Sequence, residues 1–167
     1  MVSTLKWGQP KSYTFWFVEG LSTLFAPETL DCDGHTFEER YVYFLQSDKL
    51  LATDSTENVN FIRDFDSMAQ IETDSLQVDS RVSENNVTQE VLDKIYYSQT
   101  AYIVGYLIDN YGIEKYKQLW QSGMSHFDEI YGISFDELIQ TINDELNKKY
   151  PDPIDFNWDI FKEKCMK

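Results

Sequence analysis

A single carboxylate lies in the middle of an otherwise apolar stretch of the sequence. Glu19 is flanked by aromatic and aliphatic residues in the segment FWFVEGLSTLF, residues 15–25. Burying an unpaired charge is costly, so a carboxylate in this position needs a cation, a metal ion or a proton. A structural salt bridge would meet that need as well as a metal would. Gly20, which follows Glu19, would let another backbone segment approach closely.

Three segments follow one another in a recognisable order. They are WFVEGLSTLF at 16–25, YSQTAYIVGYLIDNYG at 97–112 and YGISFDELIQTINDEL at 131–146. In order and spacing they resemble the gluzincin zinc metallopeptidases of the peptidase MA-like superfamily, which has thermolysin-like and aminopeptidase N-like branches. The resemblance covers roughly residues 15–149. It implies a mainly α fold, namely the helical C-terminal subdomain of such a catalytic domain.

The resemblance assigns roles to two residues. Glu19 matches the third zinc ligand of the family. Tyr97 matches the tyrosine that, in the aminopeptidase branch, donates a hydrogen bond to the tetrahedral oxyanion. Tyr97 could equally be an aromatic residue of the core. Thr23 stands four residues after Glu19, where the thermolysin-like branch often has an Asp.

The sequence departs from the family at the zinc-binding motif, because HExxH is absent. The only histidines are His35 and His126, and neither has the i, i+4 partner that places two imidazoles on one helical face. Catalytic zinc needs three protein ligands and an open position for water. We therefore expect either a partial metallopeptidase domain or a relative that has kept the scaffold and lost catalysis. A complete version would use zinc to hydrolyse peptides, and these residues alone would bind no zinc tightly and be inactive.

The cysteines and His35 provide weaker candidates for chemistry. Cys32 and Cys165 lie near opposite ends of the chain and form no CxxC pair. One disulfide could join them, but such sparse usage favours two free thiols in a reducing compartment. His35 follows Asp31-Cys32-Asp33-Gly34, which could bind a metal weakly but is more typical of a surface turn.

Apolar periodicity and capping patterns predict the helices that would position these residues. Thr36 with Glu39, and Ser134 with Glu137, have the spacing of capping boxes. The predicted helices are residues 13–25, a helix opened by Thr36, Gln89–Tyr111, Ile113–Ser122, a short helix begun by Ser125 and ended at Gly132, and a helix opened by Ser134 and ended by Pro151.

The organisation expected from these patterns is one helical domain with an insertion. Residues 1–150 form the domain, and residues 47–87 lack any period and are predicted to be an irregular insertion. Residues 151–167 carry enough aromatic side chains to dock on the core as a C-terminal tail.

Charge and composition narrow the partners that we expect. With 29 acidic and 14 basic residues the net charge is −15, which argues against nucleic acid as a partner. No apolar run is long enough to span a membrane and no signal peptide is visible, although members of the family are often exported or membrane-anchored. A completed domain would act on a peptide or protein. The alternative is a non-enzymatic, acidic helical module that binds a protein through its aromatic surface.

Overall fold

The computed structural model describes residues 7–8, 15–26, 32–51 and 89–165, and within these residues the chain is helical with no strand. This confirms the predicted mainly α class, whereas most of the predicted insertion at 47–87 lies outside the described residues. In chain order the elements are α2 (Phe15–Leu24), α3 (Phe37–Gln46), α6 (Gln89–Tyr111), α7 (Ile113–Ser122), the 3₁₀ turn η2 (Met124–His126), α8 (Phe127–Tyr131), α9 (Phe135–Lys149) and α10 (Trp158–Lys164).

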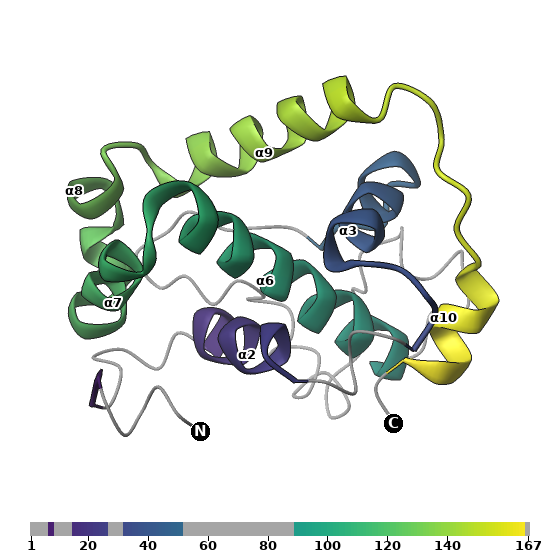
Figure 1. Cartoon of the computed structure of the whole chain (residues 1–167), viewed down its shortest axis with the longest axis horizontal. Helices are drawn as coiled ribbons and strands as arrows, with labels where there is room; N and C mark the ends of the chain where they lie inside the picture. The colour runs from purple at the N-terminus through teal and green to yellow at the C-terminus, as the bar shows by residue number, and fades with distance from the viewer. Residues whose placement is uncertain (1–6, 9–14, 27–31, 52–88, 166–167) are drawn as a thin grey trace, which may run out of the picture.

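The 23-residue helix α6 runs through the centre of the fold and contacts α2, α3 and α7 (Figure 1). α7 and α8 lie at its C-terminal end, and α9 crosses above it in this view (Figure 1). α10 reaches its N-terminal end, where Lys94 donates a hydrogen bond to the carbonyl of Lys162. Because α6 touches most of the other helices, it fixes their relative positions.

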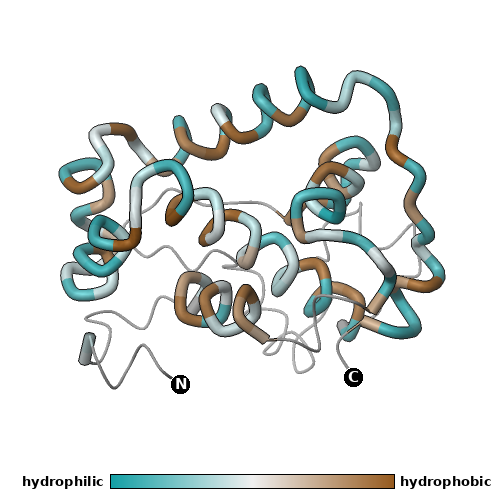
Figure 2. The backbone as a smooth tube through the Cα atoms, viewed as in Figure 1, coloured by the Kyte–Doolittle hydropathy of each residue, from teal (hydrophilic) through white to brown (hydrophobic). Residues whose placement is uncertain are grey.

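The core forms where the apolar faces of the helices meet. Trp16 and Phe17 of α2 are buried, and Phe17 accepts a hydrogen bond at its carbonyl from the buried Tyr116 hydroxyl, 2.6 Å away. On α9 the buried positions recur every four residues, at Leu138, Ile142 and Leu146. Figure 2 accordingly shows hydrophobic and hydrophilic residues alternating along α9. Burial of these side chains is the main contribution to holding α2 and α9 on the fold.

Both predicted capping boxes are present. The side chain of Thr36 accepts a hydrogen bond from the Glu39 amide at 3.2 Å, and Glu39 Oε2 accepts one from the Thr36 amide at 2.8 Å. Ser134 and Glu137 make the same pair of bonds at the start of α9. Each box satisfies amides that the first helical turn leaves without partners, which explains why the sequence marks these two helix starts.

The predicted start of the short helix at Ser125 is wrong. Ser125 lies inside η2, and α8 follows with no side-chain hydrogen bond at its start. The Ser125 hydroxyl instead lies 3.1 Å from Nδ1 of the neighbouring His126. A local side-chain contact thus replaces the cap. The predicted end at Gly132 is confirmed, since Gly132 has the left-handed conformation (φ 79°) that a helix terminus favours.

Candidate functional site

Glu19 and Tyr97 lie near one another where α2 packs on α6. Burial raises the pKa of the Tyr97 phenol above its usual value, and the negative charges of Glu19 and Asp93 raise it further. Both Glu19 and Tyr97 are half-buried. The structure therefore brings together the two residues to which the family resemblance assigns roles, although they are 78 positions apart (97 minus 19).

The close packing of α2 on α6 explains how this pair is positioned. Gly20 is buried against α6, and a β-carbon placed on it would lie 2.7 Å from the carbonyl oxygen of Thr100. Trp16 and Phe17 anchor the same helix in the core. Glu19 lies at the margin of this contact, so its carboxylate is only half-buried, which is less than the apolar segment around it suggests.

Neither polar group of the pair has a protein partner in the described residues. The Glu19 carboxylate forms no hydrogen bond or ion pair there, and the Tyr97 hydroxyl forms no hydrogen bond there. An ordinary phenol is protonated at neutral pH, and the raised pKa of Tyr97 extends this state to higher pH, so its hydroxyl can donate a hydrogen bond. The surface thus places a negatively charged hydrogen-bond acceptor, the Glu19 carboxylate, next to a hydrogen-bond donor, the Tyr97 hydroxyl.

Asp93 is a third member of this surface that the sequence reasoning missed. It precedes Tyr97 by four residues on α6, and its charge acts on the Tyr97 phenol. Residues four apart on a helix share a face, so this spacing was the signal that could have found it. Thr23, four residues after Glu19, is buried and supplies no carboxylate.

The donor set around Glu19 does not fit a zinc ion by itself. Within the described residues, the group of His, Cys, Asp and Glu side chains with metal-binding spacing is Cys32, Asp33 and Cys165, and Glu19 is not part of it. One carboxylate is too few for zinc, which takes three protein ligands in catalytic sites and four in structural ones. Glu19 can therefore act only as one ligand among others.

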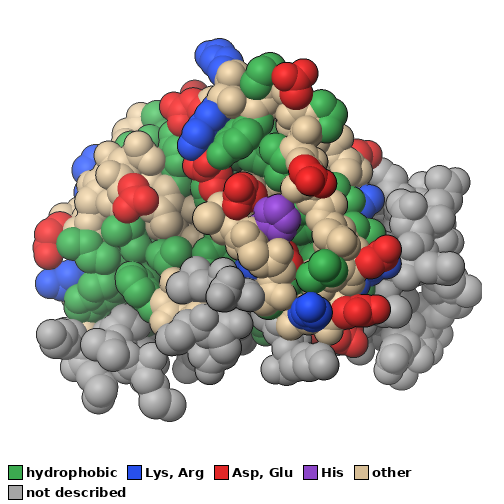
Figure 3. Space-filling model, turned by 45° about the vertical axis from the view of Figure 1, so that its right-hand side comes forward, with side chains coloured by type: hydrophobic (Ala, Val, Ile, Leu, Met, Phe, Trp, Pro, Cys, Tyr) green, Lys and Arg blue, Asp and Glu red, His purple; other side chains and the backbone are tan. Residues whose placement is uncertain are grey.

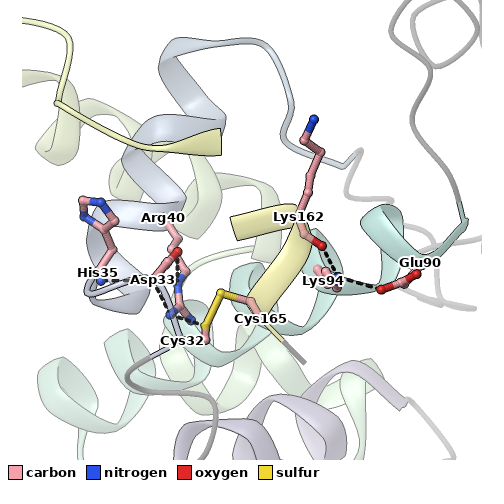
Figure 4. Close-up of a disulfide and its surroundings, with 8 residues drawn as sticks. All are labelled: Cys32, Asp33, His35, Arg40, Glu90, Lys94, Lys162 and Cys165. Atoms are coloured by element: carbon pink, nitrogen blue, oxygen red, sulfur yellow. Dashed lines mark hydrogen bonds and ion pairs between the residues drawn. A yellow bond between two sulfur atoms is a disulfide. The ribbon is translucent and has the colours of Figure 1, made fainter. Parts of the chain in front are cut away.

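Cys32 and Cys165 form a disulfide, so the prediction of two free thiols is wrong (Figure 4). The two cysteines are 133 residues apart in the sequence, so local patterns do not predict their pairing. They meet because α10 packs on α6 in the same hydrophobic cluster that Cys32 contacts. Both thiols are consumed, so this group offers no thiolate to a metal in the disulfide form. Sparse cysteine usage is thus explained here by a single long-range crosslink.

A buried arginine supports the disulfide. Nη2 of Arg40 lies 2.7 Å from Oδ1 of Asp33 and 3.0 Å from Sγ of Cys32, and the side chains of Arg40 and Asp33 are fully buried (Figure 4). The guanidinium also lies over the ring of Phe37, 5.2 Å from its centroid. This arrangement ties the turn before α3 to the end of α10, which gives it an architectural role.

The two histidines lie in separate places. Nδ1 of His35 is 3.8 Å from Oε2 of Glu39, and its ring packs on Phe156 with centroids 4.7 Å apart. His126 contacts Ser125 at the junction of η2 and α8. Neither imidazole belongs to a metal-binding group in the described part of the chain.

In Figure 3 the Asp and Glu side chains are scattered over the visible face among hydrophobic and polar ones. Of the helices that the structure describes, none combines the length and apolarity of a membrane span.

Comparison of this chain with protein-family models, with curated proteins and with solved structures finds no significant match. A functional assignment consequently depends on the three motifs and on the geometry around Glu19 and Tyr97.

Proposed function

We propose that this chain is the helical part of a gluzincin-type zinc metallopeptidase domain, in which Glu19 serves as a zinc ligand and Tyr97 as an oxyanion donor. The observation that carries the proposal is the placement of a half-buried carboxylate beside a half-buried, protonated phenol, both without partners in the described residues. Both groups keep partial access to solvent and make no hydrogen bond or ion pair to a described residue, so they are available to a ligand. The motif order adds independent support.

The chemistry of the two side chains suits these roles. When bound, zinc lowers the pKa of its water and polarises the substrate carbonyl. Glu19 would help to hold the ion through its free carboxylate. Tyr97 would donate to the oxygen of the tetrahedral intermediate, a contribution that typically accelerates such reactions by about 10²–10³-fold. The negative charge of Asp93 adds, after burial and Glu19, to the raised pKa of the Tyr97 phenol. The remaining ligands and the general base must come from an HExxH segment.

The test is to express the natural open reading frame that contains these residues and to search it for HExxH. We expect the product to bind one zinc ion and to cleave peptides. Glu19→Gln should reduce the zinc content, whereas Tyr97→Phe should keep the zinc and lower kcat. Glu129→Gln and Tyr111→Phe serve as matched controls, because Glu129 is exposed on α8 and Tyr111 lies at the far end of α6.

A reading frame without HExxH would contradict the proposal, as would a zinc content that Glu19→Gln leaves unchanged. Either result would favour the alternative of a non-enzymatic, acidic helical module that binds a protein partner. If Tyr97→Phe hydrolyses peptides with an unchanged kcat, Tyr97 has no part in the mechanism, and the proposed zinc site still stands.

A further inference from the structure

A cavity of about 410 Å³ opens between α2, α3, α6 and α9. Its volume lies in the range of pockets that hold small molecules. The cavity contacts Tyr102, which is five residues from Tyr97 and therefore about 140° around α6 from it. Tyr106 and Asp109 lie about 180° and 120° around the helix from Tyr97, although Ala101, four residues after Tyr97, also lines the cavity. Most of the cavity therefore faces away from Tyr97, and ligand binding there does not require the proposed roles of Glu19 and Tyr97.

The walls of the cavity are aromatic and aliphatic. Phe37, Tyr102 and Tyr106 line it, together with Leu24 and Leu146. The rings of Tyr102 and Tyr106 lie with their centroids 6.5 Å apart and their planes inclined at 56°. Gly105 lies between these two tyrosines in sequence and also lines the cavity, so part of the space exists because this position has no side chain.

The charged groups at the cavity are predominantly negative. Glu38, Asp109 and Glu145 contribute carboxylates, and Lys149 is the one cation among the described residues that line the cavity. Lys149 is already committed, since its Nζ lies 2.7 Å from Oε1 of Glu38. The cavity therefore retains an excess of negative charge, of which Glu145 and Asp109 are the source.

Two polar groups remain available to a ligand. Glu145 accepts one hydrogen bond, from the Tyr106 hydroxyl at 2.9 Å, and a carboxylate can accept several more. The Tyr102 hydroxyl makes no hydrogen bond to any described residue, and the side chain is partly buried. A ligand that entered the cavity could therefore meet both groups at once.

We propose that this cavity binds an organic cation, an ammonium group carried on an apolar or aromatic body. The body would pack against Phe37, Tyr102 and Tyr106. The ring faces of the two tyrosines would also attract the ammonium, whereas the Phe37 ring already has the Arg40 guanidinium over it. The ammonium would donate to Glu145 and to the Tyr102 hydroxyl oxygen. An anion would be repelled by the carboxylates, and a neutral molecule would gain no ion pair with Glu145, which is exposed at the margin of the cavity.

The experiment compares three probes of similar shape and different charge: phenethylamine, 2-phenylethanol and phenylacetate. Binding to the purified chain is followed by NMR chemical-shift changes at pH 7. We expect phenethylamine to bind about tenfold more tightly than the alcohol, since a hydrogen bond to a charged group is worth roughly that factor. Phenylacetate should not bind. The largest NMR chemical-shift changes should fall on the residues that line the cavity.

Two variants locate the binding. Glu145→Gln keeps an acceptor for Tyr106 and removes the charge, so it should weaken phenethylamine binding about tenfold. Gly105→Leu should abolish binding by filling the cavity, and an unchanged circular dichroism spectrum would show that the helix persists. Glu163→Gln on α10 is the matched control, because Glu163 is exposed and does not line the cavity.

A second pair of probes tests whether the cation belongs to a peptide side chain or to a free amine. N-acetyl-lysine methylamide represents a peptide side chain, and cadaverine represents a free amine. Preference for the first would identify a peptide as the ligand, and preference for the second a free amine. The proposal is overturned if no amine binds at millimolar concentration, if the alcohol binds as well as phenethylamine, or if Glu145→Gln has no effect.

Discussion

Gly20 of α2 lies directly against Thr100 of α6. A β-carbon at Gly20 would come within 2.7 Å of the Thr100 carbonyl oxygen and of Val104 Cγ2. Backbone atoms cannot move aside as a flexible side chain can, so Gly20→Ala must separate the two helices. We expect this substitution to lower the free energy of unfolding by roughly 2 kcal/mol, as overpacking does elsewhere. Urea unfolding monitored by tryptophan fluorescence measures the change.

Gly105 provides the control for this prediction. A β-carbon there would meet only the Leu24 side chain, at 3.5 Å, which is an ordinary contact. Gly105→Ala should therefore be neutral, or stabilising by up to about 1 kcal/mol, because alanine favours the helix more than glycine does. Equal losses in the two variants would contradict the close approach at Gly20.

The disulfide between Cys32 and Cys165 should contribute strongly to stability. It closes a loop with a sequence separation of 133 residues, and long loops lose the most entropy when they are closed in the unfolded chain. We expect Cys165→Ser to lower the free energy of unfolding by roughly 4 kcal/mol. The measurement is urea unfolding with and without dithiothreitol. Reductant should destabilise the natural chain and leave the variant unchanged, and equal stability of all samples would refute the crosslink.

The elements of the fold could be predicted well from the sequence where the signals are local. The bounds of α6 and α7 match the predicted Gln89–Tyr111 and Ile113–Ser122. The capping boxes at Thr36 and Ser134 also act within four residues. Such signals do not depend on the rest of the chain. The start of α8 was missed because the Ser125 hydroxyl has an alternative local partner in His126.

The long-range features could not be predicted in the same way. The disulfide depends on α10 returning to the turn before α3, and no periodicity in the sequence reports that return. The buried ion pair of Arg40 with Asp33 has the same origin. The proximity of Glu19 to Tyr97 was suggested by family motifs and not by spacing. Their shared surface with Asp93 emerges only when α2 is packed on α6.

The capping box of α3 should make stability depend on pH. Hydrogen bonds from Thr36 lower the pKa of Glu39 from its ordinary 4.5, chiefly through the backbone amide. A carboxyl group whose folded-state pKa is lowered stabilises the fold above its unfolded-state pKa. That stabilisation is lost as the pH falls through the lower folded value. Glu39→Gln should therefore be less stable than the natural chain at pH 7.

The difference should shrink as the pH is lowered below 4.5, the ordinary value for Glu39. Urea unfolding of both proteins at several pH values provides the measurement. Asp136→Asn is a suitable control, because Asp136 lies in the first turn of α9 but does not form its capping box. A gap between Glu39→Gln and the natural chain that is constant with pH would show that charge at Glu39 is not responsible.

The Tyr97 phenol should report the charge of Glu19. Burial is the largest cause of its raised pKa, and Glu19 is the largest electrostatic one. Glu19→Gln should lower the pKa of Tyr97 without returning it to its ordinary value of 10.0, because burial remains. NMR titration with ¹³C-labelled tyrosine follows this single phenol. Glu129→Gln should leave the value unchanged, and an unchanged value in Glu19→Gln would place the two groups too far apart to interact.

The negative charge of Glu19 should destabilise the isolated chain. Its carboxylate is half-buried and has no hydrogen bond or ion pair in the described residues, while Asp93 brings a second negative charge to the same surface. Partial loss of water without a partner favours the uncharged side chain. Glu19→Gln should therefore raise the free energy of unfolding at pH 7 by about 1 kcal/mol, and Glu129→Gln should not.

A structural ion pair predicts the opposite, because removing one buried partner costs about 3–5 kcal/mol. Urea unfolding at pH 7 separates the two outcomes. A gain in stability is the behaviour of a group kept for binding at the expense of the fold, whereas a clear loss would make Glu19 part of the architecture and remove the main support for its role as a ligand.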